Sequence, residues 1–270
     1  MDGKRPDIGK LTRLMERLRG PGGCPWDREQ TLPSLVPFII EEAYEVVSAI
    51  DSGSFESVKE ELGDLLFQII FVSRIAKEAG QFDLSDVIER SYEKMVRRHP
   101  HVFGDKEART SEEVLMQWAE IKKGEKKPEG AEAGYLSGVP EVLPALMRAH
   151  KISEKAARAG FDWKDVDEVL KKFEEELKEF MEALRMRDAA AMEEELGDLL
   201  FTVVNISRFI EVNPEDALRK TIGKFITRFH HVEKEISGRG RDLSSTPIEE
   251  MERLWGEAKA KEKKSKKPTP

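Results

Sequence analysis

One stretch of sequence occurs twice in this chain: residues 59–67 read KEELGDLLF, and residues 193–201, 134 positions later, read EEELGDLLF. Around both copies, apolar residues recur at the three- and four-residue spacing of a helix face, whereas alternating, strand-like runs are scarce. A long internal repeat with helical periodicity predicts an all-α protein built from two tandem helical-bundle domains.

The similarity continues on both sides of the repeat. Upstream, IIEEAYEV at 39–46 aligns with FEEELKEF at 173–180 at the same offset. Downstream, small register shifts align Lys94 with Lys224, Arg98 with Arg228, and Trp118 with Trp255. The Gly-, Pro- and Lys-rich segment between the copies is typical of a linker. We therefore expect an N-terminal domain at 1–123, a linker at 124–138, a C-terminal domain at 139–260 and a basic tail at 261–270.

Composition narrows the class of protein. The 270 residues are 39% hydrophobic and 36% charged, with a formal net charge of -8, which argues against a nucleic-acid-binding protein. With one cysteine, no apolar leader at the N-terminus and no membrane-length apolar run, we expect a cytoplasmic protein without a membrane partner. Only four Gln and two Asn accompany the many charged residues, which suggests a thermophilic source.

Clustered carboxylates are the main functional signal. The N-terminal copy carries E-E-x-x-E and then E-x-x-D, formed by Glu41, Glu42, Glu45, Glu61 and Asp64. The C-terminal copy carries the same pattern in Glu175, Glu176, Glu179, Glu195 and Asp198. Residues three or four apart share one helix face, and the 15 residues between the two motifs allow a turn at Gly53 and an antiparallel return. We therefore expect the two motifs of each copy to face each other across a helix–helix groove.

A solvated charged face is the simplest alternative interpretation of such a cluster. Three features count against it: like charges one turn apart repel, the second motif is embedded in apolar sequence, and the constellation recurs at the same internal spacing. Convergent carboxylates that offer only oxygen ligands suit Mg²⁺, with Mn²⁺ as a possible substitute.

The motifs together resemble one known family. The context GCPWD (23–27), EEAYE (41–45), ELGDLLF (61–67) and RRHPHVF (97–103) is similar to the MazG nucleoside triphosphate pyrophosphohydrolases of the two-domain, tandem-repeat type. The resemblance implies an all-α fold, a homodimer, and Mg²⁺ held by the acids. It also implies hydrolysis of NTPs and dNTPs to the monophosphate and pyrophosphate, as house-cleaning of the nucleotide pool. A narrower pyrophosphatase acting on dUTP or phosphoribosyl-ATP, or a non-catalytic helical scaffold, are the alternatives.

The two copies are not equivalent in the residues that surround the acids. Lys172 lies one turn before Glu175, where a cation can meet a phosphate, and Phe38 takes the matching position in the N-terminal copy. We therefore expect catalysis at the five acids of the C-terminal copy. Its candidate substrate-binding residues are Lys172, Lys224, Arg228 and Lys259 for phosphates and Trp255 for the base. A core role for this tryptophan is the alternative.

Overall fold

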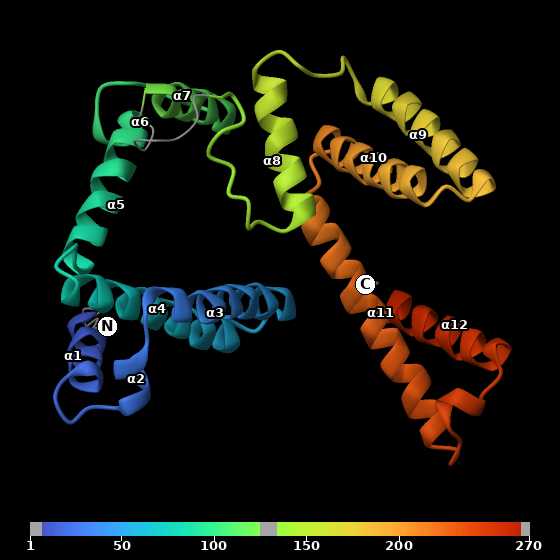
Figure 1. Ribbon diagram of the computed structural model, residues 1–270, viewed down its shortest axis with the longest axis horizontal. Coiled ribbons are helices and arrows are strands. Elements are labelled where there is room, and N and C mark those ends of the chain that lie inside the picture. The colour runs from blue at the N-terminus through green and yellow to red at the C-terminus, as the bar shows by residue number, and fades with distance from the viewer. Residues whose placement is uncertain (1–6, 125–133, 266–270) are drawn as a thin grey trace. The chain divides into compact units, whose positions relative to one another are not determined.

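The chain is almost entirely helical in the computed structural model, which describes residues 7–124 and 134–265 (Figure 1). Within those two ranges there is no strand, so the prediction of an all-α protein is confirmed. None of the helices in the described ranges is long and apolar enough to cross a membrane.

Two compact units make up the chain, Met1–Lys126 and Lys127–Pro270. The helices of the N-terminal unit are α1 (Gly9–Arg19), α2 (Pro25–Glu29), α3 (Leu32–Ser52), α4 (Phe55–Glu78), α5 (Leu84–Arg98), α6 (Pro100–Phe103) and α7 (Ser111–Gly124). Those of the C-terminal unit are α8 (Ala145–Arg158), α9 (Val166–Met186), α10 (Ala189–Phe209), α11 (Pro214–Ser237), the 3₁₀ turn η1 (Leu243–Ser245) and α12 (Ile248–Ser265). Most of the predicted linker and half of the predicted tail lie outside the described residues, and the predicted domain boundaries stay predictions.

A long helical hairpin forms the centre of each unit, α3 with α4 and α9 with α10. The same local rules make both hairpins. The turn passes through the left-handed conformation at Gly53 (φ 73°) and, 134 positions later, at Arg187 (φ 55°). The next residue in each copy, Ser54 or Asp188, then caps the returning helix by accepting backbone N–H bonds at its first turn. The antiparallel pairing of each hairpin follows directly from this short turn.

The other helices bury the apolar sides of these hairpins. In the N-terminal unit, α1 packs on α4 and closes a core around Met15, Leu35, Ile70 and Phe71. In the C-terminal unit, α8 packs on α10 and on α11, and α12 packs mainly on α11. This second contact forms a separate small core of Val232, Ile236 and Leu254.

The last helices show where the copies differ in shape. In the N-terminal unit, α5 ends before Pro100, whose ring cannot donate the next helical hydrogen bond. In the C-terminal unit the aligned position is His230, and α11 continues without a break to Ser237. The RRHPHVF motif therefore turns the chain in the first copy, and the ring of His99 packs against Trp118 with centroids 4.9 Å apart.

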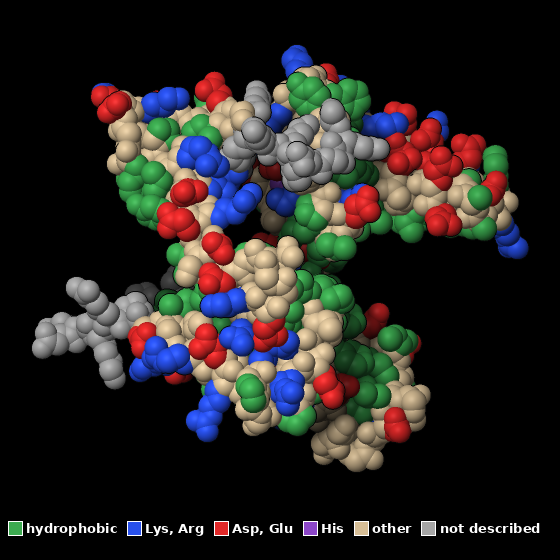
Figure 2. Space-filling view, turned by 60° about the vertical axis from the view of Figure 1, so that its left-hand side comes forward, with side chains coloured by type: hydrophobic (Ala, Val, Ile, Leu, Met, Phe, Trp, Pro, Cys, Tyr) green, Lys and Arg blue, Asp and Glu red, His purple; other side chains and the backbone are tan. Residues whose placement is uncertain are grey.

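Apolar side chains also remain half-exposed along one side of each hairpin. On α9, Leu177, Met181 and Leu184 are 42%, 49% and 42% exposed, and they recur at helical spacing. On α10, Leu196 and Leu200 continue the same pattern at 48% and 51%. Figure 2 shows such hydrophobic side chains reaching the surface between the charged ones. The hairpins thus carry apolar stripes that their own units do not cover.

Candidate functional site

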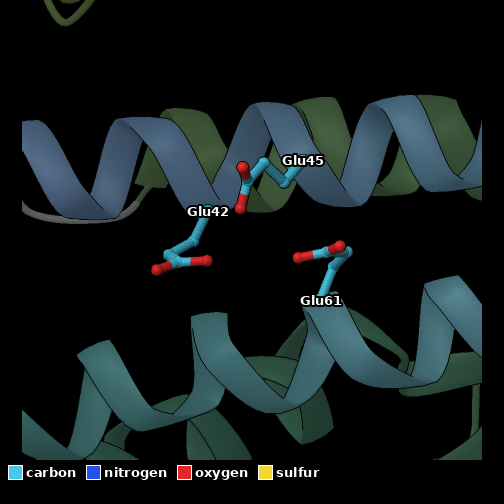
Figure 3. A group of neighbouring side chains, drawn as sticks. All are labelled: Glu42, Glu45 and Glu61. Atoms are coloured by element: carbon cyan, nitrogen blue, oxygen red, sulfur yellow. The ribbon is translucent and has the colours of Figure 1, made fainter.

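Three carboxylates of the N-terminal hairpin converge across its groove. Glu42 and Glu45 project from α3 toward Glu61 of α4 (Figure 3), and each offers an oxygen within 4.8 Å of the others. Glu42 and Glu45 share a face because they are three residues apart, and the antiparallel turn brings Glu61 opposite to them. The two motifs therefore meet across the groove at these three residues, as the sequence led us to expect.

The C-terminal hairpin repeats the arrangement at the residues 134 positions later. Glu176 and Glu179 of α9 and Glu195 of α10 offer oxygens within the same 4.8 Å limit. Glu176 is the most enclosed of the three, with 5% of its surface exposed. Burial of a carboxylate is costly unless a cation or hydrogen-bond donors compensate for the lost water. This trio therefore requires a positive partner.

The mutual repulsion of these acids is visible in their pKa values. Burial raises the pKa of the Glu42 carboxyl, and the nearby charges of Asp64, Glu45 and Glu41 raise it further. Burial likewise raises the pKa of Glu61, together with neighbouring carboxylates led by Glu45. A site that gathers negative charge in this way is prepared for a cation.

Glu195 behaves in the same manner in the C-terminal copy. Its pKa is raised first by burial and then by four carboxylates, namely Glu179, Glu176, Asp198 and Glu194. The ligands available at both trios are carboxylate oxygens, the donors that hard divalent cations prefer. Both trios therefore fit a divalent metal ion.

The remaining predicted ligands lie at the edges of the trios. Glu41 and Asp64 influence Glu42 through their charge, but neither belongs to the converging group of the first copy. Asp198 acts on Glu195 in the same way in the second copy, and Glu175 points to Lys172. Their assignment as metal ligands stays a prediction.

One neighbouring position separates the two copies. Lys172 Nζ lies 2.6 Å from Glu176 Oε1 and 2.8 Å from Glu175 Oε1, and these bonds raise the pKa of the ammonium group above its usual value. At the matching position, Phe38 packs its ring edge-on against Trp26 of α2, with centroids 5.7 Å apart. The lysine predicted to meet a phosphate thus contacts the site's own acids in this structure.

The other predicted substrate-binding residues gather on α11 and α12. Arg228 pairs with Glu262 of α12, with Nη2 2.8 Å from Oε2, and its guanidinium carbon lies 5.6 Å from the centre of the Trp255 ring. Trp255 also contacts Phe225, with ring centroids 4.9 Å apart. Lys224 and Lys259 lie exposed on the same two helices. These residues form a cationic and aromatic group of their own.

An apolar groove of about 310 Å³ opens beside this group, lined among others by Phe225, Phe229, Met251 and Trp255. Trp255 packs against the small core of α11 and α12 and also faces this groove, so the structural and the base-binding interpretations are both compatible with its position. The size and aromatic lining of the groove suit a flat ring system.

Within the C-terminal unit, the acids and this cationic group lie on two different pairs of helices. The acids lie on α9 and α10, which pack on each other, whereas the extensive packing of α12 is on α11 (Figure 1). Consistent with this separation, the charged groups that shift the pKa of Glu195 are all carboxylates, with none of the cations of α11 or α12 among them. The unit therefore holds two half-sites, one acidic and one cationic and aromatic.

Two residues that contribute to these sites were missed in the sequence, Gln68 beside the acids and Phe225 beside the groove. Gln68 hydrogen-bonds to Glu42 in the first copy, and Thr202 takes its place in the second. A polar residue one turn after Asp64, inside an otherwise apolar run, was the available signal. Phe225 was also missed, although its spacing of four from Phe229 puts two aromatic rings on one face of α11.

The structure defines a class of protein: an all-α chain in which two helical hairpins each present a carboxylate trio that fits a divalent metal. The model of the MazG nucleotide pyrophosphohydrolase domain matches residues 30–103 and again residues 156–233. Both matches include the trios, but neither reaches Trp118 or Trp255. The chain therefore belongs to the MazG family.

Two proteins that match this chain over nearly their whole length support this assignment. The chain is 47% identical over 253 residues to the nucleoside triphosphate pyrophosphohydrolase/pyrophosphatase MazG of Thermotoga maritima, covering 93% of this chain and 94% of that protein. It is 43% identical over 258 residues to the nucleoside triphosphate pyrophosphohydrolase of Escherichia coli, covering 94% and 98%. A crystal structure of a MazG-related protein from Thermotoga maritima is 29% identical, covers 43% of this chain and 99% of that one, and has a TM-score of 0.38.

Proposed function

We propose that this protein hydrolyses nucleoside triphosphates to the monophosphate and pyrophosphate, with Mg²⁺ held by the carboxylate trios. The observation that carries the proposal is the convergence of Glu176, Glu179 and Glu195 in a chain of the MazG family. The names of the relatives at 47% and 43% identity agree with this activity.

The residues of the trio have distinct tasks in such a reaction. Glu176, the enclosed member, and Glu195, opposite to it, would hold the metal from two helices. Bound Mg²⁺ would neutralise the triphosphate and lower the pKa of an attacking water. Glu179, the exposed member, would complete the metal ligands with one oxygen and accept a proton from that water with the other. Attack at the α-phosphorus then releases pyrophosphate, whose charge calls for cationic side chains.

We place turnover in the C-terminal copy. It combines the trio with Lys172 and, on α11 and α12, with the exposed cations Lys224 and Lys259 and the aromatic groove beside Trp255. In the N-terminal copy the position of Lys172 is taken by Phe38 under Trp26, which removes one cation from the neighbourhood of the acids. The N-terminal trio is proposed to bind metal with little turnover.

The reaction class is tested by following a panel of NTPs and dNTPs with Mg²⁺ or Mn²⁺ and identifying the products. We expect the monophosphate and pyrophosphate in a ratio of one to one. Diphosphate plus orthophosphate would refute attack at the α-phosphorus. The absence of any hydrolysis with both metals would refute the enzymatic function and favour a helical scaffold.

We further propose that a homodimer completes the site. The acidic half-site on α9 and α10 and the cationic half-site on α11 and α12 pack separately, and the hairpin leaves the stripe of Leu177, Met181 and Leu184 half-exposed. A second copy that covers such a stripe would bury apolar surface and can bring its cationic half-site to these acids.

Heterodimers of two defective chains test this completion. One chain would carry Glu179→Gln and the other Lys224→Met, and the mixed species would be isolated through two different tags. If the half-sites come from different chains, one of the two sites is intact and about half of the wild-type activity returns. Activity that stays at the level of the two homodimers would show that each site is completed within its own chain.

A further inference from the structure

Within residues 7–124 and 134–265, Lys172 holds the one ion pair of a trio member. Its Nζ lies 2.6 Å from Glu176 and 2.8 Å from Glu175, which follow it on α9 by four and three residues. The Glu176 side chain is 6% exposed, whereas that of Lys172 is 37% exposed and that of Glu175 is 58% exposed. The ammonium group thus reaches from the protein surface to the enclosed carboxylate of the trio.

This contact satisfies the requirement that burial imposes on Glu176. An enclosed carboxylate needs a compensating cation or several donors, and Lys172 supplies both a charge and a hydrogen bond. The first copy has a different arrangement: Phe38 cannot donate, and the corresponding Glu42 receives a neutral hydrogen bond from Gln68. The two trios therefore differ in net charge before any metal arrives.

The lysine and a divalent ion compete for the same oxygen. A metal that binds Glu176 has to displace the ammonium group into water and then keep a like charge close by, which weakens binding of the free ion. A nucleotide triphosphate changes this balance, because its phosphate oxygens give the displaced ammonium a new partner. Metal and nucleotide then each strengthen the binding of the other.

We propose that Lys172 is a tethered counter-ion that keeps free divalent metal out of the C-terminal trio until it arrives with a nucleotide triphosphate. The N-terminal trio lacks this counter-ion and takes free metal directly. The inference rests on the proposed function, since it assumes that both trios bind metal. Lys172 is a positioning residue for the metal in this scheme, and it exchanges a carboxylate for a phosphate when the substrate binds.

Mn²⁺ binding to the full chain tests the proposal without any measurement of turnover. In the Glu45→Gln background, which leaves the C-terminal trio as the intact one, we expect Lys172→Met to tighten Mn²⁺ binding by about tenfold, the factor associated with one charged hydrogen bond. Lys171→Met is the matched control, because it removes the same charge from the adjacent, exposed position of α9. Lys172→Arg retains the cation and is expected to bind Mn²⁺ like the parent chain.

The nucleotide provides a second measurement, in which Lys172→Met is expected to reduce an effect on Mn²⁺ binding rather than to increase it. With α,β-methylene-ATP as a non-hydrolysable probe, Mn²⁺ binding should tighten strongly in the parent chain and much less in Lys172→Met. If Lys172 had only a structural role, Lys172→Met would not both tighten Mn²⁺ binding and weaken the coupling of Mn²⁺ to the nucleotide. The reciprocal exchange, Phe38→Lys in the Glu179→Gln background, should weaken Mn²⁺ binding at the N-terminal trio.

The possible results separate the inference from the function on which it rests. Equal Mn²⁺ affinity in Lys172→Met, Lys171→Met and the parent chain would overturn the counter-ion and leave the metal site in place. Weaker affinity in Lys172→Met would also overturn it. If neither the parent nor Lys172→Met binds Mn²⁺ at all, with or without the nucleotide, the proposed function itself fails.

Discussion

Replacing Glu179 by Gln removes one charge from the C-terminal trio and leaves the shape of the side chain unchanged. Glu179 is exposed on α9, and its carboxylate is one of the three that converge within 4.8 Å. Because its neighbours in the trio are Glu176 and Glu195, the substitution also relieves repulsion between like charges. Activity and stability should therefore change in opposite directions.

The size of the effect follows from the task of the trio. A metal ion that polarises a phosphoryl oxygen supplies several kcal/mol of transition-state stabilisation, and each 1.36 kcal/mol is a factor of ten in rate. Loss of one of three converging ligands should therefore lower kcat/KM by about 10²- to 10³-fold. Pyrophosphate release measured against NTP concentration gives this number, and thermal melting without metal should show an equal or higher Tm.

Two matched variants make the comparison sharp. Glu45→Gln removes the equivalent acid of the N-terminal trio and should lower kcat/KM by less than about twofold. Glu174→Gln removes an exposed charge from α9 outside the trio and should have no effect. Equal losses in Glu45→Gln and Glu179→Gln would refute the assignment of turnover to the C-terminal copy. A lowered Tm in Glu179→Gln would show that repulsion within the trio was overestimated.

Three further outcomes are expected. The pKa of Glu195 is raised in the folded chain, so its contribution to stability is present below the unfolded value near 4.5 and is lost as pH rises through the folded value. Without metal, the advantage in unfolding free energy of Glu195→Gln over the parent should therefore grow from pH 4 to pH 7, and a constant difference would contradict this. Mg²⁺ at about 100 times its Kd should stabilise the chain by about 2.7 kcal/mol in urea unfolding, and no shift would argue against metal binding. Asn205 is 1% exposed, and its Nδ2 donates to the carbonyl of Phe201, but its Oδ1 has no hydrogen-bond partner among the described residues. Asn205→Leu should therefore add about 1 kcal/mol to the urea stability, whereas a loss would show that this oxygen is satisfied.

Local rules account for what the sequence predicted well. The turn expected at Gly53 lies between α3 (Leu32–Ser52) and α4 (Phe55–Glu78), as the structure shows. Both have strong end signals, since Ser54 caps the second helix and Gly53 takes the left-handed turn between the two. Once the hairpin is fixed, the spacing of three between Glu42 and Glu45 determines which carboxylates meet Glu61.

Long side chains account for what the sequence could not predict. Spacing places Lys172 one turn from Glu175, but it does not decide whether the ammonium group meets a phosphate or the acids beside it. Arg228 is a stronger case, because its partner Glu262 lies 34 residues away on another helix. Such a pair depends on how α12 packs along α11, which no local pattern in either helix specifies.

The same reasoning explains where the two copies have diverged. The acids that converge are at identical spacing in both copies, as a shared metal geometry requires. Two of the substitutions lie one turn away, where Phe38 is aligned with Lys172 and Gln68 with Thr202. Both leave the ligands in place, and the first also changes the charge that balances them before metal binds. Two sites that load metal differently have to differ beside their ligands, and the exchange of Phe38 for Lys172 is a difference of that kind.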